Sequence, residues 1–125
     1  MGKSAGDMVA QANAEIDTMS IEAARDLVGA DNVLILDVRE EAEVAKGKIP
    51  GALHVSRGLL EFIADSNSPM HNPSLTPDKH VVVVCASGGR SALAGKTLKD
   101  MGFQQVTNML GGMNAWRAAS YDIEG

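Results

Sequence analysis

Residues 81–91 of the chain read VVVVCASGGRS, and this stretch joins two different kinds of structural element. Four consecutive valines favour a β-strand, and a strand that is apolar on both sides suits the interior of a parallel sheet. Two adjacent glycines then permit a tight turn, and residues 91–101 carry apolar side chains at helical spacing. The stretch therefore predicts a buried strand, a tight loop and a helix, with Cys85 at the carboxyl end of the strand.

The other segments of the chain alternate between the same two kinds of element. The expected strands are 18–20, 33–36, 52–55, 81–84 and 105–107, the expected helices are 7–16, 21–28, 40–46, 58–64, 91–101 and 113–119, and residues 65–79, with three prolines, are expected to form a loop. Strands that alternate with helices indicate a three-layer α/β domain with a mainly parallel sheet. In such sheets ligands bind beyond the carboxyl ends of the strands, which is where Cys85 is expected.

The length of 125 residues suits one domain built around one hydrophobic core. We expect residues 1–17 to form an N-terminal extension, either a short helix or a frayed segment, and residues 18–120 to form the domain. Hydrophobic residues make up 45% of the chain and aromatic residues only 3%, so the core must consist mainly of aliphatic side chains.

Charge and cysteine content exclude several classes of function. A net charge of -5 argues against a general binder of nucleic acid or of anionic membranes, although a small anion can still bind in a locally positive pocket. The single cysteine excludes an internal disulfide and a Cys-rich zinc site. The start of the chain lacks the apolar segment of a secretory signal, and no apolar run is long enough to span a bilayer, so the expected location is the cytoplasm.

The loop after the valines has the residue types of an anion-binding site. Gly88 and Gly89 allow the backbone to curl so that successive N–H groups turn inward, and such a nest attracts negative charge. The following helix adds the partial positive charge of its N-terminus, and Arg90 adds a full charge. A cysteine in such surroundings has a pKa of roughly 3.5–7.5. We therefore expect Cys85 to be a solvent-accessible thiolate at neutral pH.

The alternative for Cys85 is a buried and inert core residue, which is the usual state of a lone cysteine after an apolar strand. The glycines and the arginine that follow favour the reactive interpretation, because a helix that begins without a ligand needs neither.

Five segments of the chain resemble, in the same order, the motifs of the rhodanese family. They are residues 37–40 (DVRE), 47–52 (GKIPGA), 85–91 (CASGGRS), 101–103 (MGF) and 111–116 (GGMNAW). The resemblance runs from about residue 18 to residue 119. It implies an α/β/α sandwich around a five-stranded, mostly parallel sheet, and sulfur transfer with Cys85 as the nucleophile.

Two departures and one spacing qualify the resemblance. Lys48 stands where family members often carry histidine, but its position in a turn predicts little effect on the chemistry. Larger members of the family have a second, inactive domain, for which this chain has no room. Four residues separate Cys85 from Arg90, whereas the related phosphatases place five there, so the shorter loop favours a single sulfur atom over a phosphate.

The charged residues near the loop have two possible uses each. Arg90 either contacts substrate or braces the loop through a carboxylate such as Asp37, and Asp37 is expected to act as a brace. Arg39 offers positive charge at the mouth of the site or, as the favoured alternative, forms a surface ion pair with a nearby glutamate. Arg57 lines the entrance or is a solvated surface residue. Trp116 and Phe103 are expected in the core, and no histidine has the spacing of a metal ligand.

The predicted function is transfer of a sulfane sulfur through a persulfide on Cys85, with the loop residues Ala86, Ser87, Gly88, Gly89, Arg90 and Ser91 binding the sulfur. The expected donor is a small anion such as thiosulfate, and the acceptor is cyanide, a thiol or a protein. Mercaptopyruvate, glutathione persulfide and a protein persulfide are alternative donors. No metal or organic cofactor is expected. The alternatives are a non-catalytic or partner-dependent persulfide carrier and arsenate or phosphate-ester chemistry in the same loop.

Overall fold

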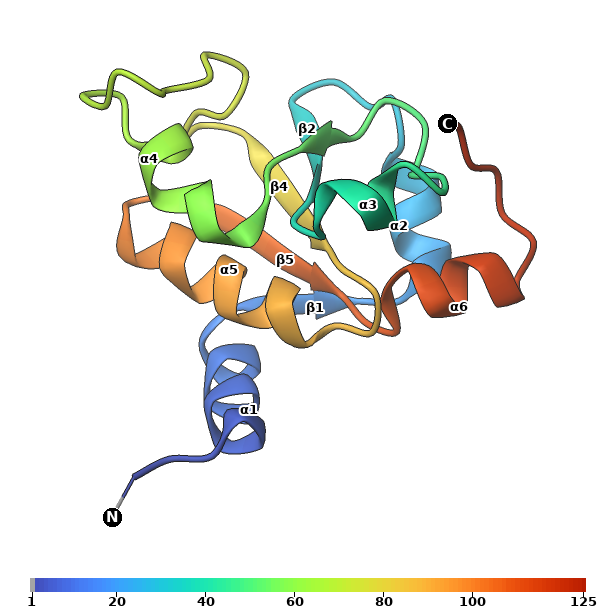
Figure 1. Cartoon of the computed structure of the whole chain (residues 1–125), viewed down its shortest axis with the longest axis horizontal. Coiled ribbons are helices and arrows are strands. Elements are labelled where there is room, and N and C mark those ends of the chain that lie inside the picture. Colours follow the sequence, from blue (N-terminus) through green and yellow to red (C-terminus); the bar gives the residue numbers. More distant parts are fainter. Residues whose placement is uncertain (1) are drawn as a thin grey trace.

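A computed structural model describes residues 2–125, and its centre is a five-stranded sheet (Figure 1). The strands are β1 (Asp17–Met19), β2 (Val33–Asp37), β3 (Leu53–His54), β4 (His80–Val84) and β5 (Gln105–Met109). Their order across the sheet is β1-β5-β4-β2-β3, and every neighbouring pair is parallel. The predicted parallel sheet is confirmed, with β4 at its centre.

The valines of β4 supply side chains to both faces of the sheet. Val81 and Val83 belong to one apolar cluster, and Val82 and Val84 belong to the other. All four are fully buried. This two-sided burial explains why the strand is a continuous apolar run and does not alternate with polar residues.

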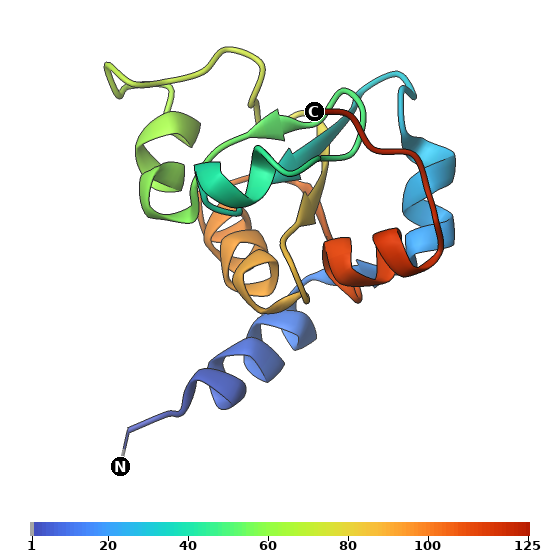
Figure 2. The same ribbon diagram turned by 45° about the vertical axis from the view of Figure 1, so that its right-hand side comes forward.

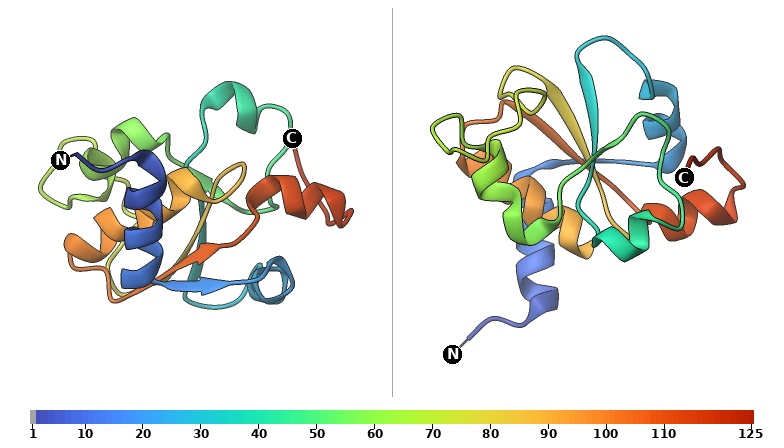
Figure 3. Two further views of the ribbon diagram at one scale, coloured as in Figure 1. Left: turned by 90° about the horizontal axis from the view of Figure 1, so that it is seen from below. Right: turned by 45° about the horizontal axis from the view of Figure 1, so that its top comes forward.

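Helices cover both faces of the sheet. One face carries α4 (Leu60–Ala64) and α5 (Gly89–Asp100), and the other carries α2 (Ile21–Leu27) and α6 (Gly112–Ala118). Figure 3 shows the strands between these two layers. The predicted α/β/α sandwich is therefore confirmed, and Trp116, 1% exposed, lies in its core as expected.

The first helix, α1 (Ala5–Glu15), extends from the body of the domain (Figure 2). It begins two residues before the expected start because Ser4 forms a capping box with Asp7: the Asp7 N–H donates to the Ser4 hydroxyl at 3.0 Å, and the Ser4 N–H donates to the Asp7 carboxylate at 3.2 Å. The helix lies against α5, where an added Cβ on Gly95 would come within 2.6 Å of Cδ1 of Ile16. A glycine at position 95 thus permits the close approach of the two helices.

Two short elements complete the fold. Helix α3 (Glu41–Val44) follows β2 and is shorter than expected, and η1 (Arg57–Leu59) is a 3-10 turn that leads into α4. Residues 65–79 contain neither helix nor strand, as predicted. Among residues 2–125, no helix combines the length and the apolar character needed to cross a membrane.

Candidate active site

Cys85 directly follows β4, at the carboxyl edge of the sheet, and α5 begins four residues later. Between them the backbone turns sharply at Gly88, whose φ of 115° is unfavourable for any residue with a side chain. This turn aims the Gly88 N–H at the Cys85 sulfur, with 3.1 Å between N and Sγ. The predicted strand, loop and helix therefore form, and at least one loop amide points inward.

Helix α6 fixes the direction of the loop peptides. The N–H of Met113 donates to the Cys85 carbonyl at 2.8 Å, and the N–H of Asn114 donates to the Ala86 carbonyl at 2.9 Å. In a trans peptide the C=O and the next N–H point in opposite directions. Since the Ala86 carbonyl faces α6, the N–H of Ser87 must face away from α6, toward the sulfur.

The start of α6 approaches this loop so closely that only glycine fits there. Gly112 has a φ of 57°, and a Cβ added to it would lie 2.5 Å from the carbonyl oxygens of both Cys85 and Ala86. From the sequence, residues 111–112 are expected only to precede the helix at 113–119. The role of Gly112 in holding the loop could not be predicted, because it depends on the contact between two distant segments.

Opposing effects set the pKa of Cys85. Burial raises the pKa of the thiol. Hydrogen bonds to the thiolate together lower it further: the Ser91 hydroxyl donates one when it turns toward the sulfur, and the backbone N–H groups of Ser91, Gly88 and Ser87 donate the others. The net result is a pKa below the ordinary value for cysteine. This direction agrees with the expectation of an activated thiol.

The expected exposure of Cys85 is wrong: the residue is only 1% exposed. It packs into the apolar cluster on the α5 face, together with Val38, Val83 and Ala94. The expectation failed because neither the sequence of the strand nor that of the loop reveals that this apolar cluster covers the sulfur. The sulfur is therefore covered by its neighbours and is not open to solvent, in contrast to the expectation.

The carboxylate partner of Arg90 is Glu43 and not Asp37, the example of a partner expected from the sequence. Its guanidinium donates to both carboxylate oxygens of Glu43, at 2.7 and 2.9 Å. The hydrogen bond from Arg90 is the main reason why the pKa of Glu43 falls to about 2, and the pKa of Arg90 is correspondingly raised. The pair thus stays ionised through the whole neutral range, and its contribution to stability is complete above pH 4.5 and is lost as the pH falls toward 2.

Asp37 and Arg39 form a buried pair with each other. The Arg39 guanidinium donates to Asp37 at 2.8 Å, and the two side chains are 5% and 1% exposed. The predicted surface ion pair of Arg39 is therefore wrong. Arg39 also donates to the backbone carbonyls of Glu43 and Gly47, so it fixes the turn that carries the carboxylate partner of Arg90. Asp37 therefore contacts this turn only through Arg39, and its bracing role stays a prediction.

The Glu43–Arg90 pair supplies a first prediction about the sulfur. In Glu43→Gln the amide oxygen still accepts hydrogen bonds, but the charge of Arg90 is no longer neutralised. Because Arg90 interacts electrostatically with Cys85, we expect the pKa of Cys85 to fall by roughly 0.5–1 unit. The pH dependence of alkylation by iodoacetamide measures this shift.

Glu61→Gln is the matched control for that measurement, because Glu61 is the exposed carboxylate partner of Arg57 at 3.1 Å. It should leave the alkylation profile unchanged. Equal profiles for wild type and Glu43→Gln would contradict an effect of Arg90 on the sulfur.

Arg57 lies on the α5 face of the domain, with its guanidinium held by two partners. It donates to Glu61 and, at 3.0 Å, to the hydroxyl of Thr97 in α5. Thr97 is about two helical turns from Arg90 along α5. The structure thus gives Arg57 a bracing contact, and its place at an entrance stays a prediction.

Ser91 and Asn108 form a polar cluster behind the sulfur. The Ser91 hydroxyl oxygen lies 3.3 Å from Sγ of Cys85 and donates to Oδ1 of Asn108 at 2.6 Å. Asn108, in β5, is fully buried. Sequence reasoning missed Asn108, because an asparagine in an expected strand carries no signal of what it faces.

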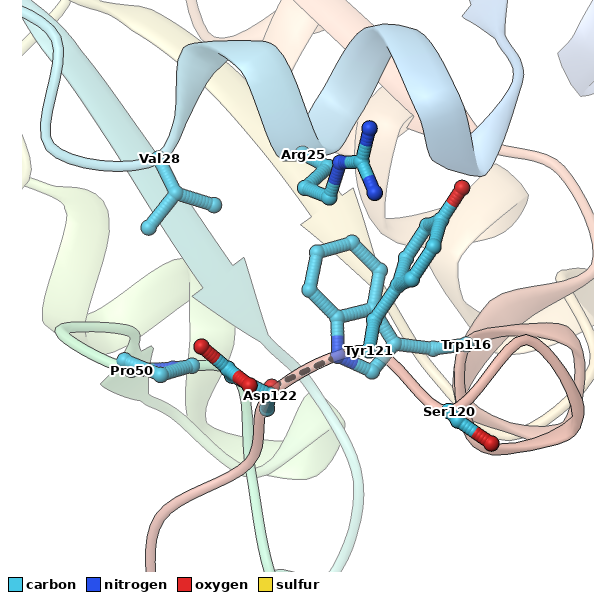
Figure 4. A pocket seen from close by; sticks show the side chains of 7 residues that line it. All are labelled: Arg25, Val28, Pro50, Trp116, Ser120, Tyr121 and Asp122. Carbon is cyan, nitrogen blue, oxygen red and sulfur yellow. Dashed lines mark hydrogen bonds between the residues drawn. The ribbon is translucent and has the colours of Figure 1, made fainter.

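No group of three or more potential metal ligands occurs within residues 2–125. A hollow of about 380 Å³ lies between α2, α6 and the C-terminal segment (Figure 4), and no residue of the loop 85–91 lines it. Arg25 stacks over the ring of Tyr121 there, 4.4 Å from its centroid, and Tyr121 meets Trp116 edge to face. The candidate site at Cys85 is thus separate from this hollow.

Comparison with known proteins gives the family. Residues 20–119 match the rhodanese-like domain. The chain belongs to the rhodanese family. This rhodanese is 40% identical over 103 residues to the putative sulfurtransferase YtwF of Bacillus subtilis, covering 82% of the chain and 91% of the relative. The putative sulfur carrier protein YrkF of Bacillus subtilis is 35% identical over 112 residues, which are 89% of this chain but only 56% of YrkF.

The fold of this rhodanese is also found in solved structures. The protein of unknown function RPA3614 from Rhodopseudomonas palustris, described as a possible tyrosine phosphatase, is 42% identical and superposes with a TM-score of 0.94 over 99% of this chain and 96% of its own. With YtwF and YrkF, a putative sulfurtransferase and a putative sulfur carrier are thus among the homologues of this chain.

Proposed function

We propose that this rhodanese is a sulfurtransferase that carries a sulfane sulfur on Cys85 from a small anionic donor, such as thiosulfate, to a thiophilic acceptor. The observation that carries the proposal is the environment of the sulfur: Gly88 donates its N–H to Sγ at 3.1 Å, and the N–H groups of Ser87 and Ser91 also lower the pKa of the thiol. These amides favour the thiolate, which is the form of cysteine that attacks sulfur.

In the first step the Cys85 thiolate attacks the outer sulfur of thiosulfate. A new S–S bond forms to Cys85, the S–S bond of thiosulfate breaks, and its electron pair leaves with sulfite. The protein then carries a persulfide with one negative charge on its terminal sulfur. The inward amides of the loop stabilise this charge as they stabilise the thiolate.

In the second step a thiophile such as cyanide attacks the terminal sulfur. The bond to that sulfur from Cys85 breaks, thiocyanate leaves, and the Cys85 thiolate is restored. No oxidant or reductant is consumed, because Cys85 is the nucleophile in the first step and the leaving group in the second. A thiol or a cysteine of another protein serves as acceptor in the same way.

The burial of Cys85 bears on the choice of donor. With the residue 1% exposed, a small anion requires less movement of the surrounding groups than a large donor does. Within the loop, Ser87 is exposed, so we expect a donor to approach the sulfur from that side. This supports thiosulfate over a bulky persulfide as the donor.

Phosphatase chemistry, the activity suggested for RPA3614, is disfavoured by the arginine of the loop. A phosphate needs the guanidinium to face it with both N–H groups, but Arg90 gives both of its short hydrogen bonds to Glu43. The spacing of four residues between Cys85 and Arg90 adds to this argument.

Intact mass spectrometry tests the proposed function directly. We expect the protein to gain the mass of one sulfur atom after incubation with thiosulfate and to lose it after addition of cyanide. Protein alkylated on Cys85 beforehand is the control, because Cys85 is the only cysteine in the chain. Absence of the added sulfur under every donor condition would refute sulfur transfer, and labelling only in the presence of a second protein would instead identify a dedicated carrier.

A further inference from the structure

A chain of hydrogen bonds connects the N-terminal helix to the candidate nucleophile. The Asn108 side-chain amide donates to Oδ1 of Asn13 at 2.9 Å, Ser91 donates to Oδ1 of Asn108 at 2.6 Å, and the Ser91 oxygen lies 3.3 Å from Sγ of Cys85. Asn13 belongs to α1, which precedes the residues that match the rhodanese-like domain. A residue outside the family domain thus ends a relay that begins at the reactive sulfur.

The direction of each hydrogen bond in the relay is fixed by its surroundings. The NH2 group of Asn108 also donates to the backbone carbonyl of Gly88 at 3.1 Å. A carbonyl only accepts hydrogen bonds, so the amide cannot be turned over, and its oxygen must face Ser91. That oxygen in turn only accepts, so the single hydroxyl hydrogen of Ser91 points at Asn108.

This arrangement decides what Ser91 offers to the sulfur. With its hydrogen given to Asn108, Ser91 presents a lone pair to Cys85. A lone pair can accept the S–H of a neutral thiol, but it repels a thiolate. To stabilise a thiolate, the Ser91 hydroxyl must turn and donate to the sulfur, as the backbone amides of the loop do.

Turning the Ser91 hydroxyl has a cost that depends on Asn108. Both residues are fully buried, so water cannot replace the donated hydrogen. The Oδ1 atom of Asn108 would then remain without a donor, which costs about 1–3 kcal/mol for a buried acceptor. Asn108 therefore competes with the Cys85 thiolate for one hydrogen atom.

Asn13 determines how firmly Asn108 is held in this competition. The side chain of Asn13 is half-buried. Contacts on either side of Asn13 in the sequence hold α1 against α5: Val9 lies near Gly89, and Ile16 lies against Gly95. Asn13 thus supplies one of the two acceptors that orient the Asn108 amide.

We propose that Asn108, oriented by Asn13 of α1, directs the Ser91 hydroxyl away from Cys85 and so opposes, in the resting protein, the ionisation that the backbone amides of the loop favour. Asn108 and Asn13 are positioning residues, and α1 is part of the active site. The inference rests on the proposed function only for its biological meaning, since the relay acts on the thiol itself. In the resting protein it protects the sulfur, and Ser91 turns when a donor is attacked.

The charged groups around the sulfur are already paired, which makes the relay the adjustable part of the site. On α5 the nearest charge is that of Arg90, which Glu43 of α3 neutralises. At the end of β2, Asp37 and Arg39 neutralise each other. On β4 the titrating group is His80, at the opposite end of the strand, and its pKa is lowered mainly by burial.

The test measures the pKa of Cys85 from the pH dependence of alkylation, with α1 variants of the full chain. Asn13→Ala removes the acceptor for Asn108, loosens its amide and frees the Ser91 hydroxyl, so the pKa of Cys85 should fall by about 0.5 unit. Asn13→Asp keeps an acceptor and adds negative charge, so the pKa should stay equal or rise. Gln11→Ala, which removes an exposed amide from the same helix, should leave it unchanged.

The background variant Ser91→Ala separates the relay from a general structural effect. In that background Asn13→Ala should no longer shift the pKa of Cys85, because the hydroxyl through which it acts is gone. A shift that persists without Ser91, or an unchanged pKa in Asn13→Ala, would overturn the inference. Asn108 itself is not substituted, because it also holds the carbonyl of Gly88 and its loss would disturb the loop.

This measurement needs no sulfur donor, so it can fail or succeed independently of the proposed function. Shifted pKa values without persulfide formation would leave the relay intact and refute sulfur transfer. Persulfide formation with unchanged pKa values would support sulfur transfer and refute the relay.

Discussion

Cys85→Ser should reduce thiosulfate:cyanide sulfur transfer by at least about 1,000-fold, because a hydroxyl is neither ionised at neutral pH nor able to hold a persulfide. The fold should be preserved. The serine hydroxyl occupies nearly the same volume and can accept the N–H of Gly88, so the free energy of unfolding should change by about 1 kcal/mol or less. Steady-state assays and chemical denaturation measure the two quantities.

The contrasting outcome for this variant is residual transfer at a substantial fraction of the wild-type rate. It would mean that sulfur moves through another group and would remove Cys85 from the mechanism. Loss of activity would also follow if Cys85→Ser failed to fold. The denaturation curve of Cys85→Ser distinguishes loss of the nucleophile from loss of the folded state.

Gly112→Ala should destabilise the protein by about 3 kcal/mol or more, which is a large effect for the addition of one methyl group. The new Cβ would lie 2.5 Å from two backbone carbonyl oxygens, and backbone atoms cannot rotate away as a side chain can. The start of α6 must then move from the loop, and the peptides of Cys85 and Ala86 lose the donors that orient them. We therefore also expect the pKa of Cys85 to rise toward its ordinary value and sulfur transfer to fall by more than about tenfold.

Gly58→Ala is the control for this substitution. Gly58 lies in a 3-10 turn, its φ is not positive, and a Cβ there meets no atom within 4 Å. Its melting temperature should match or slightly exceed that of the wild type. If Gly112→Ala behaves like Gly58→Ala, then α6 does not hold the loop, and the account of the inward amides must be abandoned.

The fold could be predicted from the sequence because its signals are local. The valines before Cys85 predict a strand that is buried on both sides. Ser20 predicts the start of the helix that follows Ser20, and in the structure its hydroxyl accepts the N–H of Ala23 at 3.2 Å. Such signals need only the neighbouring residues. The ends of β3 and α3 were predicted less well because both are very short.

The partners of the charged residues could not be predicted, because they depend on contacts between distant segments. Arg90 and Glu43 are far apart in the sequence, and nothing around either residue selects the other. Arg39 stands among three glutamates, which suggested a surface pair, yet it turns inward to Asp37. The burial of Cys85 and the relay through Asn108 arise in the same way, from packing of β5 and α5 that the loop sequence does not reveal.

A sulfur atom loaded onto Cys85 could not be displaced by another cysteine of these 125 residues. Many redox proteins discharge such a species by attack from a second thiol, which yields a disulfide. Here the thiol stands alone among 125 residues and is enclosed by apolar neighbours. The charged intermediate should therefore persist until an outside acceptor arrives, and its lifetime should be set by the concentration of that acceptor.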